Sequence, residues 1–430
     1  MRARFGRTFQ SLWIRNYRLF SVGQVIKLIA VWMQFVAQDW LVLELTDNSA
    51  YALGIVTALQ FAPVLLLTLY GGKLADRYDK RRLLIWANAA FSALALALGV
   101  LVVTGLVTLY AVFFFAAAMG VAHAIENPVR QSFVYELVGR ELLPNALSLS
   151  SATFNTARIV GPAAAGALIA LLGTGPIFLL NAATYLAPAV ALLRIRVDDL
   201  HRETRTEPVG GVRDGLRYVV RREDLVLPLL LLFVVGLVGF NFNLTLPVLA
   251  KVTYQTGPET FGLLMTSLAV GSLFGALASG GRRARPSVYV VIGAAIGFGV
   301  LATVAGLVPS FIGTVAVLVP TGFFMIYFAQ ATNQRLQLGV DAVYRGRVMA
   351  TYVLVFAGTT PLGGPLVGAL AEHFGPRVSI WGGGLVSLLA GLAALAWQLR
   401  RSGSRIGVRL RPLPQFYVIP AESQAVASTR

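Results

Sequence analysis

The sequence predicts an all-α membrane protein in which twelve transmembrane helices form two six-helix halves. The 430-residue chain is 57% hydrophobic and only 13% charged, which is too apolar for a domain that folds in water. Twelve stretches have the roughly 20 largely apolar residues that one crossing of a bilayer needs. Most basic residues fall in the intervals that an even number of crossings leaves on one side of the membrane. These observations predict both the fold class and the topology.

Each half of the chain contains six predicted spans. Those of the first half cover residues 19–45, 51–70, 83–104, 107–124, 147–172 and 176–193. Those of the second half cover residues 225–249, 261–278, 288–308, 311–330, 348–370 and 378–399. The predicted organisation is therefore an N-terminal half (1–193), a cytoplasmic linker (194–224), a C-terminal half (225–399) and a cytoplasmic tail (400–430).

The lysine and arginine residues are distributed unevenly between the two sides. Of 36 basic residues, 32 lie in the tails and loops on the side shared by both termini. Short loops rich in lysine and arginine stay in the cytoplasm, so both termini are predicted to be cytoplasmic. The net charge of +17 follows from this topology. Nucleic acid is not an expected partner, whereas the lipid bilayer is.

Matching residues recur in the two halves at nearly constant offsets. The pairs, 203 to 208 positions apart, are Gly54 with Gly262, Gly72 with Gly280, Arg130 with Arg335, and Gly161-Pro162 with Gly364-Pro365. Because each half has six spans, both halves begin on the same side of the membrane. The repeat is therefore parallel, with its axis along the membrane normal.

The linker and the tail differ from the spans in composition. Residues 212–221 place apolar side chains opposite arginines at helical spacing, which predicts an amphipathic helix either on the inner leaflet or in solvent. The tail contains three prolines and little periodicity, so it is expected to be disordered.

The charged loop after the second span carries a recognisable signature. Residues 71–82 read GGKLADRYDKRR. This resembles the loop motif of the major facilitator superfamily, with Asp79 in place of a glycine. The resemblance implies that family's two-half fold and alternating access. We expect Asp76 to face the cationic N-terminus of the eleventh span when the cytoplasmic side is closed. The predicted gate residues are Gly72, Asp76, Arg77, Arg81, Arg345 and Arg347.

Further motifs resemble the branch that contains enterobactin-exporter and macrolide-efflux proteins. They are ENPVRQ at 126–131, RELLPNA at 140–146 and YRGRVM at 344–349. The fifth span, RIVGPAAAG from Arg158, also resembles the G-P-x-x-x-G element of drug and proton antiporters, although the fourth span lacks the arginine that many of them carry. The resemblance implies a monomeric bacterial plasma-membrane exporter of a drug-like or siderophore-like molecule. It would use the proton gradient and no cofactor. Close helix packing is expected at Gly161, Pro162, Gly166, Gly364 and Pro365.

Polar side chains form stripes along several spans. In the first span, Gln24, Lys27, Gln34 and Gln38 fall within an arc of about 80° at 100° per residue. Polar groups are costly in hydrocarbon, so such stripes should face a central cavity or form hydrogen bonds between helices. The expected cavity residues are Gln24, Lys27, Gln34, Gln38, Met119, Arg158, Asn241, Asn243, Tyr327, Gln330 and Gln334.

A proton-coupled exporter needs a carboxylate that can exchange a proton with both sides. Asp39 is the leading candidate because it lies within the first span, and Glu126 is expected to be its partner nearer the cytoplasm. His123 is a third candidate, although a lone histidine of this kind is commonly a packed polar residue. Lys27 and Arg158 would either pair with these acids or attract an anionic substrate.

Other classes of function are less consistent with the sequence. With no cysteine and three scattered histidines, no disulfide and no metal site are expected. No H-E-x-x-H, G-x-S-x-G or Walker motif occurs, which argues against a membrane-embedded enzyme. A lipid or lysophospholipid flippase on the same fold is the main alternative, and apolar lateral openings would favour it. The fifth span argues against an importer of sugars or nutrients.

Overall fold

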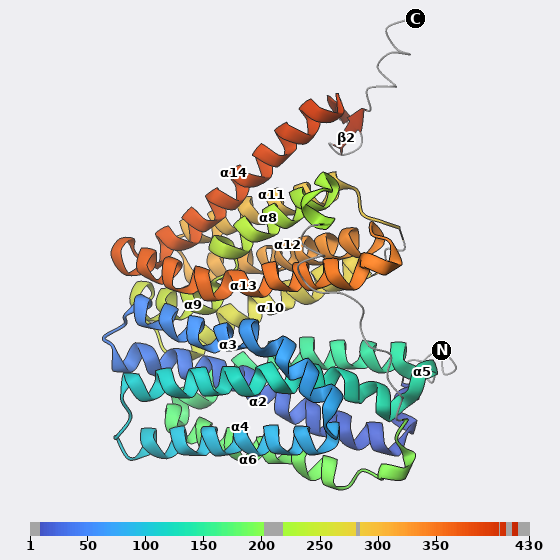
Figure 1. The fold of residues 1–430 in the computed structure, drawn as a ribbon. Coiled ribbons are helices and arrows are strands. Elements are labelled where there is room, and N and C mark those ends of the chain that lie inside the picture. The colour runs from blue at the N-terminus through green and yellow to red at the C-terminus, as the bar shows by residue number, and fades with distance from the viewer. Residues whose placement is uncertain (1–8, 202–217, 281–283, 404, 410–414, 420–430) are drawn as a thin grey trace, which may run out of the picture.

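The computed structural model describes residues 9–201, 218–280, 284–403, 405–409 and 415–419. Its helices form two groups that lie one above the other in Figure 1. The N-terminal group contains η1 (Gln10–Trp13), α2 (Arg15–Leu45), α3 (Ala50–Arg77), α4 (Lys80–Val103), α5 (Leu109–Leu172) and α6 (Thr174–Leu193). After η2 (Val197–Asp199), the C-terminal group contains α8 (Glu223–Gly239), α9 (Phe242–Val248), η3 (Leu249–Thr253), α10 (Pro258–Gly280), α11 (Val288–Leu307), α12 (Phe311–Leu338), α13 (Ala342–Phe374) and α14 (Pro376–Ser402).

The predicted fold class is confirmed. Within the described residues, eleven helical segments are long and apolar enough to cross a membrane. One of them, α5, has 64 residues and contains two of the predicted spans. The backbone of Gly139, at φ 70° and ψ −177°, separates its two arms. Counting these arms separately gives twelve crossings. The predicted seventh span is interrupted around Asn241, between α8 and α9.

Short polar residues begin several of the helices. Asp79 precedes α4, and its carboxylate accepts a hydrogen bond of 2.9 Å from the backbone nitrogen of Arg82. A side-chain oxygen at this position satisfies a backbone donor that the helix itself leaves free. The aspartate that departs from the superfamily motif therefore starts the third span. Ser49 does the same for α3 by accepting from Ala52.

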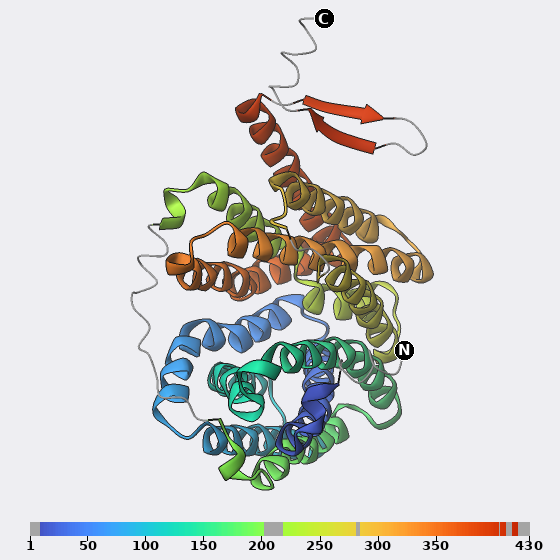
Figure 2. The same ribbon diagram turned by 90° about the vertical axis from the view of Figure 1, so that its right-hand side faces the viewer.

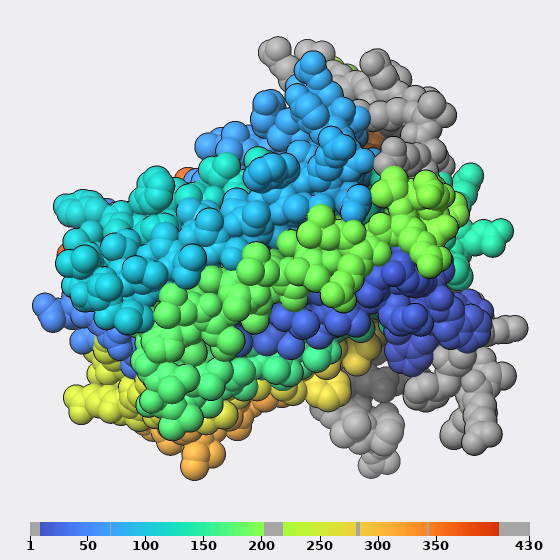
Figure 3. Space-filling model, turned by 90° about the horizontal axis from the view of Figure 1, so that it is seen from below, coloured from blue at the N-terminus to red at the C-terminus, as the bar shows by residue number. Residues whose placement is uncertain are grey.

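The outer surface of the N-terminal group is strongly apolar. Figure 3 shows α4 and α6 lying side by side on this face. Trp86 on α4 is 75% exposed, and Tyr110 at the start of α5 is 82% exposed. Exposed apolar surface of this extent is unfavourable in water. It is expected for helices that face lipid.

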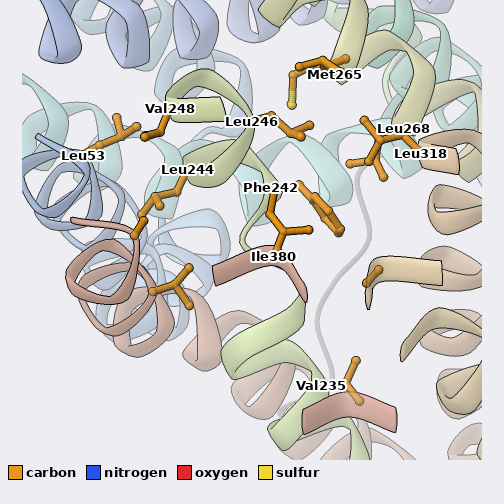
Figure 4. Close-up of a cluster of buried hydrophobic side chains, with 14 of the residues drawn as sticks. Leu53, Val235, Phe242, Leu244, Leu246, Val248, Met265, Leu268, Leu318 and Ile380 are labelled. Carbon is orange, nitrogen blue, oxygen red and sulfur yellow. The ribbon is translucent and has the colours of Figure 1, made fainter. Parts of the chain in front are cut away.

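The two groups meet along two seams. One joins α3 to α13 and the other joins α5 to α10, and Figure 2 shows α3 beneath α13 and an arm of α5 beneath α10. Around α9, apolar side chains of both groups form one core. In Figure 4, Leu53 of α3 lies beside Val248 and Leu244 of α9. This core joins the halves near the end that is predicted to face outside.

The tail departs from the sequence prediction, and the linker prediction falls mostly outside the described residues. Within the tail, which the sequence predicts to be disordered, β1 (Arg405–Arg409) and β2 (Gln415–Ile419) form an antiparallel pair. The physical reason is local, because both segments contain β-branched or aromatic residues that favour strands. Most of the predicted amphipathic helix at 212–221 lies outside the described residues.

Candidate functional site

A cavity of about 230 Å³ lies within the N-terminal half. Helices α2, α3, α5 and α6 supply all of its walls. Five predicted polar or charged residues meet there, namely Gln24, Lys27, Gln34, Gln38 and Glu126. Met119 and His123 also line it, as do the additional residues Leu28, Val31, Trp32, Phe35, Gln60, Phe61, Val64, Gly120, Asn127, Arg130, Phe154 and Tyr185.

Three charged side chains form a cluster on one wall of the cavity. The ammonium nitrogen of Lys27 lies 2.9 Å from Oε1 of Glu126, and Nε of Arg130 lies 3.1 Å from the same oxygen. Lys27 and Glu126 are each only 2% exposed. Helix spacing explains the second contact, because Glu126 and Arg130 are four residues apart on α5. We call Lys27, Glu126 and Arg130 the charge cluster.

Aromatic rings surround the charge cluster and cover the rest of the cavity. The Lys27 ammonium group lies 4.8 Å from the ring centroid of Phe91, which is a favourable cation–π distance. Away from the cluster, Trp32 packs edge to face against Phe154, with ring centroids 5.8 Å apart. Phe35 and Phe61 are stacked with centroids 6.3 Å apart. The cavity thus combines a charged wall with flat apolar walls.

The seams between the halves place repeat-related glycines in equivalent contacts. A Cβ atom added at Gly368 would lie 2.7 Å from the carbonyl oxygen of Ala50. A Cβ atom added at Gly166 would lie 2.7 Å from the carbonyl oxygen of Pro258, the repeat counterpart of Ala50. Only glycine permits such close backbone approach. The two seams are therefore pseudo-symmetric copies of one packing arrangement.

Four of the five residues expected to allow close packing lie at these seams, namely Pro162, Gly166, Gly364 and Pro365. Gly54 of α3 faces Gly364 and Pro365 of α13, and Gly262 of α10 faces Pro162 and Gly166 of α5. Gly161 instead packs within the N-terminal half, against Trp32. All the close contacts between the halves described here lie toward the end of the bundle predicted to be extracellular.

The first seam also contains a polar contact between the halves. Oε2 of Glu372, at the end of α13, accepts hydrogen bonds from the backbone nitrogens of Ala50 at 2.6 Å and Tyr51 at 3.2 Å. A carboxylate at a helix N-terminus is favoured by the free backbone donors and by the helix dipole. Glu372 thus joins the C-terminal half to the first turn of α3.

Comparison with known families identifies the chain. The model of a family described as transmembrane secretion effectors matches residues 6–416. The chain belongs to this family. It is a family of transporters within the major facilitator superfamily, so the superfamily predicted from the loop motif is confirmed.

The curated relatives of this transporter include siderophore and drug transporters. The chain is 26% identical to the staphyloferrin A transporter of Staphylococcus aureus, over 83% of this chain and 90% of that protein. It is 28% identical to the multidrug efflux pump Tap of Mycolicibacterium fortuitum, over 84% and 90% of the two chains. It is 22% identical to the enterobactin exporter EntS of Shigella boydii, over 82% and 85%.

Solved structures show the same fold at lower sequence identity. The nucleoside transporter NupG superposes with a TM-score of 0.70 at 12% identity, covering 89% of this chain and 98% of that one. A bacterial homologue of the human lysosomal transporter Spinster gives a TM-score of 0.68 at 15% identity, covering 91% and 97%. The present chain is thus a multi-pass membrane transporter of the major facilitator fold.

Several predicted cavity residues of the transporter do not line this cavity. Asn241 donates to the carbonyl oxygen of Leu237 in α8 at 2.8 Å, and Gln334 donates to the carbonyl oxygen of Ser279 at 3.0 Å. Tyr327 stacks on Phe323. The predicted residues absent from the cavity lining are Arg158, Asn241, Asn243, Tyr327, Gln330 and Gln334.

Asp39 is buried in the first span at 6% exposure. It makes no hydrogen bond or ion pair with any residue that the structure describes, and it does not line the cavity. Its neighbour Gln38 does. Asn241, a polar residue of the predicted seventh span, donates to Leu237 and not to Asp39. Asp39 is thus an embedded acid without a described charge partner.

The predicted gate residues lie at the ends of α3, α4 and α13 that are predicted to face the cytoplasm. Arg81 donates to the carbonyl oxygens of Leu192 at 2.7 Å and Leu193 at 3.0 Å, so it holds α4 to the end of α6. Arg77 lies beside the ring of Tyr78. A Cβ atom added at Gly72 would meet no atom within 4 Å. The remaining predicted gate residues are Asp76, at the end of α3, and Arg345 and Arg347, in the first two turns of α13.

Sequence reasoning missed the aromatic walls and part of the polar lining. Gln60 is a buried amide in the second predicted span, and a search for every polar residue within a span would have found it. Trp32, Phe154 and Tyr185 carry no comparable signal, because aromatic side chains also occur where helices face the lipid interface. Only the packing of four helices shows that they face the same space.

Proposed function

We propose that the protein exports a small organic molecule across the bacterial plasma membrane by proton antiport and alternating access. The observation that carries this proposal is the charge cluster within a cavity of a chain from this transporter family. Buried charges in a membrane bundle are costly and typically mark substrate or ion pathways. The relatives named as siderophore and drug transporters support export as the direction.

The arrangement of the two halves supports alternating access. Close backbone contacts hold both seams together at the end predicted to face outside. At the opposite ends of α3 and α13, a Cβ atom added at Gly72 or Gly346 would meet no atom within 4 Å. Rocking of one half against the other about the cavity would separate the seams and close the cytoplasmic ends. The repeat supports this, because the seams are equivalent.

Two embedded acids, Asp39 and Glu126, have different surroundings and are assigned different roles in proton coupling. Glu126 is held by two cations in the cavity. Asp39 is buried without a described partner, and a charged carboxylate is costly in such a position. Asp39 is therefore our candidate for the residue that takes up and releases the proton, with Glu126 as the acid beside the substrate.

The lining of the cavity supports a molecule with polar groups more than a lipid chain. Five amide side chains and the charge cluster line it. A flippase would need a lateral opening with apolar walls through which acyl chains could pass. The polar lining therefore favours the exporter among the two functions considered.

The experiment that tests the proposal is transport into inverted membrane vesicles containing the protein. A panel of drug-like and siderophore-like compounds is offered with and without an imposed pH gradient, acidic inside. We expect at least one compound to accumulate several-fold over vesicles without the protein, and the accumulation to collapse when the gradient is dissipated. Accumulation that ignores the gradient would contradict proton antiport, and movement of labelled lipid alone would favour the flippase.

A further inference from the structure

The charges on the cavity wall do not cancel. Among the lining residues, Lys27 and Arg130 carry positive charge and Glu126 carries negative charge, so two cations face one carboxylate. Both cations contact the same oxygen of Glu126. A lysine ammonium group has three donors and an arginine guanidinium group has five. Nη2 of Arg130 also donates to the amide oxygen of Asn127 at 2.9 Å, and one carboxylate still leaves positive charge and several donors unmatched.

The uncharged lining residues add to the excess of donors. The indole nitrogen of Trp32 is buried and has no hydrogen-bond partner among the described residues. An indole can only donate. Both polar atoms of Gln24 and the amide nitrogen of Gln38 also lack partners there. Because an amide offers both donors and acceptors, the glutamines adapt to a ligand, whereas Trp32 and the two cations require acceptors.

The remaining walls define the other part of a ligand. Phe35 and Phe61 lie nearly parallel, with an interplanar angle of 16°. Trp32 and Phe154 form a second aromatic pair. Flat faces of this kind bind aromatic rings through offset stacking or edge contacts. They lie on the same cavity as the charge cluster, so one molecule can reach both.

We propose that this cavity selects organic anions that carry an aromatic group, with the anion bound by Lys27 and Arg130 and the ring held by the aromatic walls. The proposal rests on the function proposed above and adds the chemical class of its substrate. In this arrangement Glu126 competes with the substrate for the same two cations. Removing the charge of Glu126 should therefore strengthen the binding of an anion, whereas it would weaken the binding of a cation.

The test uses three probes that share one ring system. They are 2-naphthoate, naphthalene-2-carboxamide and 2-naphthyl-trimethylammonium, titrated calorimetrically into the purified full-length protein without any gradient. We expect 2-naphthoate to bind at least tenfold more tightly than the other two. Glu126→Gln should tighten 2-naphthoate binding about fivefold to tenfold. Lys27→Gln should weaken it at least tenfold, and Lys27→Arg should restore most of the loss.

A second lysine–glutamate pair in the same half provides the control. The ammonium nitrogen of Lys80 lies 2.5 Å from Oε1 of Glu136, and neither residue lines the cavity. Glu136→Gln and Lys80→Gln make the same changes in charge, and neither should alter 2-naphthoate binding more than twofold. Thermal unfolding of each variant checks that the protein is folded.

Several outcomes would overturn the proposal. These are preferential binding of the ammonium probe, weaker 2-naphthoate binding in Glu126→Gln, no binding of 2-naphthoate, or equal effects from the control pair. Because binding is measured without a gradient, it can succeed even if proton-driven export fails. Conversely, the protein could export compounds in vesicles and yet show no preference for 2-naphthoate. That result would refute the proposed substrate class and leave the proposed export function standing.

Discussion

Arg130 and Arg335 occupy matching positions in the two halves, yet their side chains bind different partners. Arg130 contacts Glu126 in the cavity at 3.1 Å. Arg335 donates to the carbonyl oxygen of Pro286 at 2.8 Å, in the connection between α10 and α11. Gln334 likewise binds a backbone carbonyl within its own half. The repeat preserves the position of a residue, while the neighbouring side chains decide whether it serves a cavity or holds a loop.

This difference suggests a division of labour between the halves. The N-terminal half supplies all the residues that line the cavity. The C-terminal half supplies half of each seam and the Glu372 contact. We therefore expect substitutions at matching positions to have unequal effects on transport.

The largest effect is expected from Arg130→Gln. Arg130 contacts Glu126 on the cavity wall and is one of the two cations that we propose bind the substrate, so export per folded molecule by this variant should fall at least about tenfold. The matched variant Arg335→Gln should lose stability, since its hydrogen bond to Pro286 is lost, but keep more than half of the export per folded molecule. Transport in vesicles, normalised to the folded protein, measures both. Equal losses in the two variants would show that the halves are not specialised in this way.

A smaller effect is expected at the seams. A Cβ atom at Gly54 would lie 2.5 Å from the Gly364 oxygen, and one at Gly262 would lie 2.5 Å from the Pro162 oxygen. Gly54→Ala and Gly262→Ala should both hinder closure of the outer end and reduce export about fivefold. Gly382→Ala is the control, because a Cβ there would meet nothing within 4 Å.

The state of the outer end can be followed with a single cysteine. The chain has none of its own, and Thr57 is buried beside Gly364. In the seam variants, a Thr57→Cys side chain should react faster with a thiol reagent added from outside. Unchanged labelling would mean that the seams tolerate the extra methyl group.

At the end predicted to face the cytoplasm, Asp76→Asn should reduce export about threefold. We expect Asp76 to stabilise the outward-facing state opposite the N-terminus of α13, so the variant should insert normally but open outward less often. The Thr57→Cys side chain should then label more slowly from outside. Export at the wild-type rate would argue against this role of Asp76.

The smallest effect is expected from Glu372→Gln, and its sign is opposite. A carboxylate at an exposed helix N-terminus contributes a few tenths of a kcal/mol or more, about 0.3–1 kcal/mol, and the glutamine keeps part of the contact, so outside labelling of Thr57→Cys should rise only about twofold. The neutral glutamine can still accept backbone hydrogen bonds through its amide oxygen, but it lacks the negative charge. Slower labelling would show that Glu372 does not hold the outer end closed.

The sequence predicted the spans well because each depends on a local property. About 20 consecutive apolar residues define a crossing wherever they occur, and the loop motif at 71–82 adds the superfamily. The break at Gly139 was not visible, since a single glycine between two apolar arms has many structural roles. The strands of the tail were missed because prolines outweighed two short strand-forming segments.

The site was predicted only in part, for a related reason. Helical periodicity put Gln24, Lys27 and Gln38 on one face of the first span, and all three line the cavity. Periodicity does not show which neighbouring helix meets that face. It therefore gave the same expectation for Gln334, whose amide instead binds Ser279. Contacts between helices decide this, and they depend on the whole bundle.

The most direct test of the account is to compare two kinds of transport in Asp39→Asn, using any compound that the wild-type protein exports. Proton-driven accumulation in vesicles requires the carrier carboxylate, whereas exchange of labelled for unlabelled substrate at equal pH does not. We predict that Asp39→Asn loses accumulation driven by the gradient and retains exchange, and that Glu44→Gln, at an exposed acid on the same helix, keeps both. Full proton-driven export by Asp39→Asn would contradict the account and would leave Glu126 as the remaining candidate.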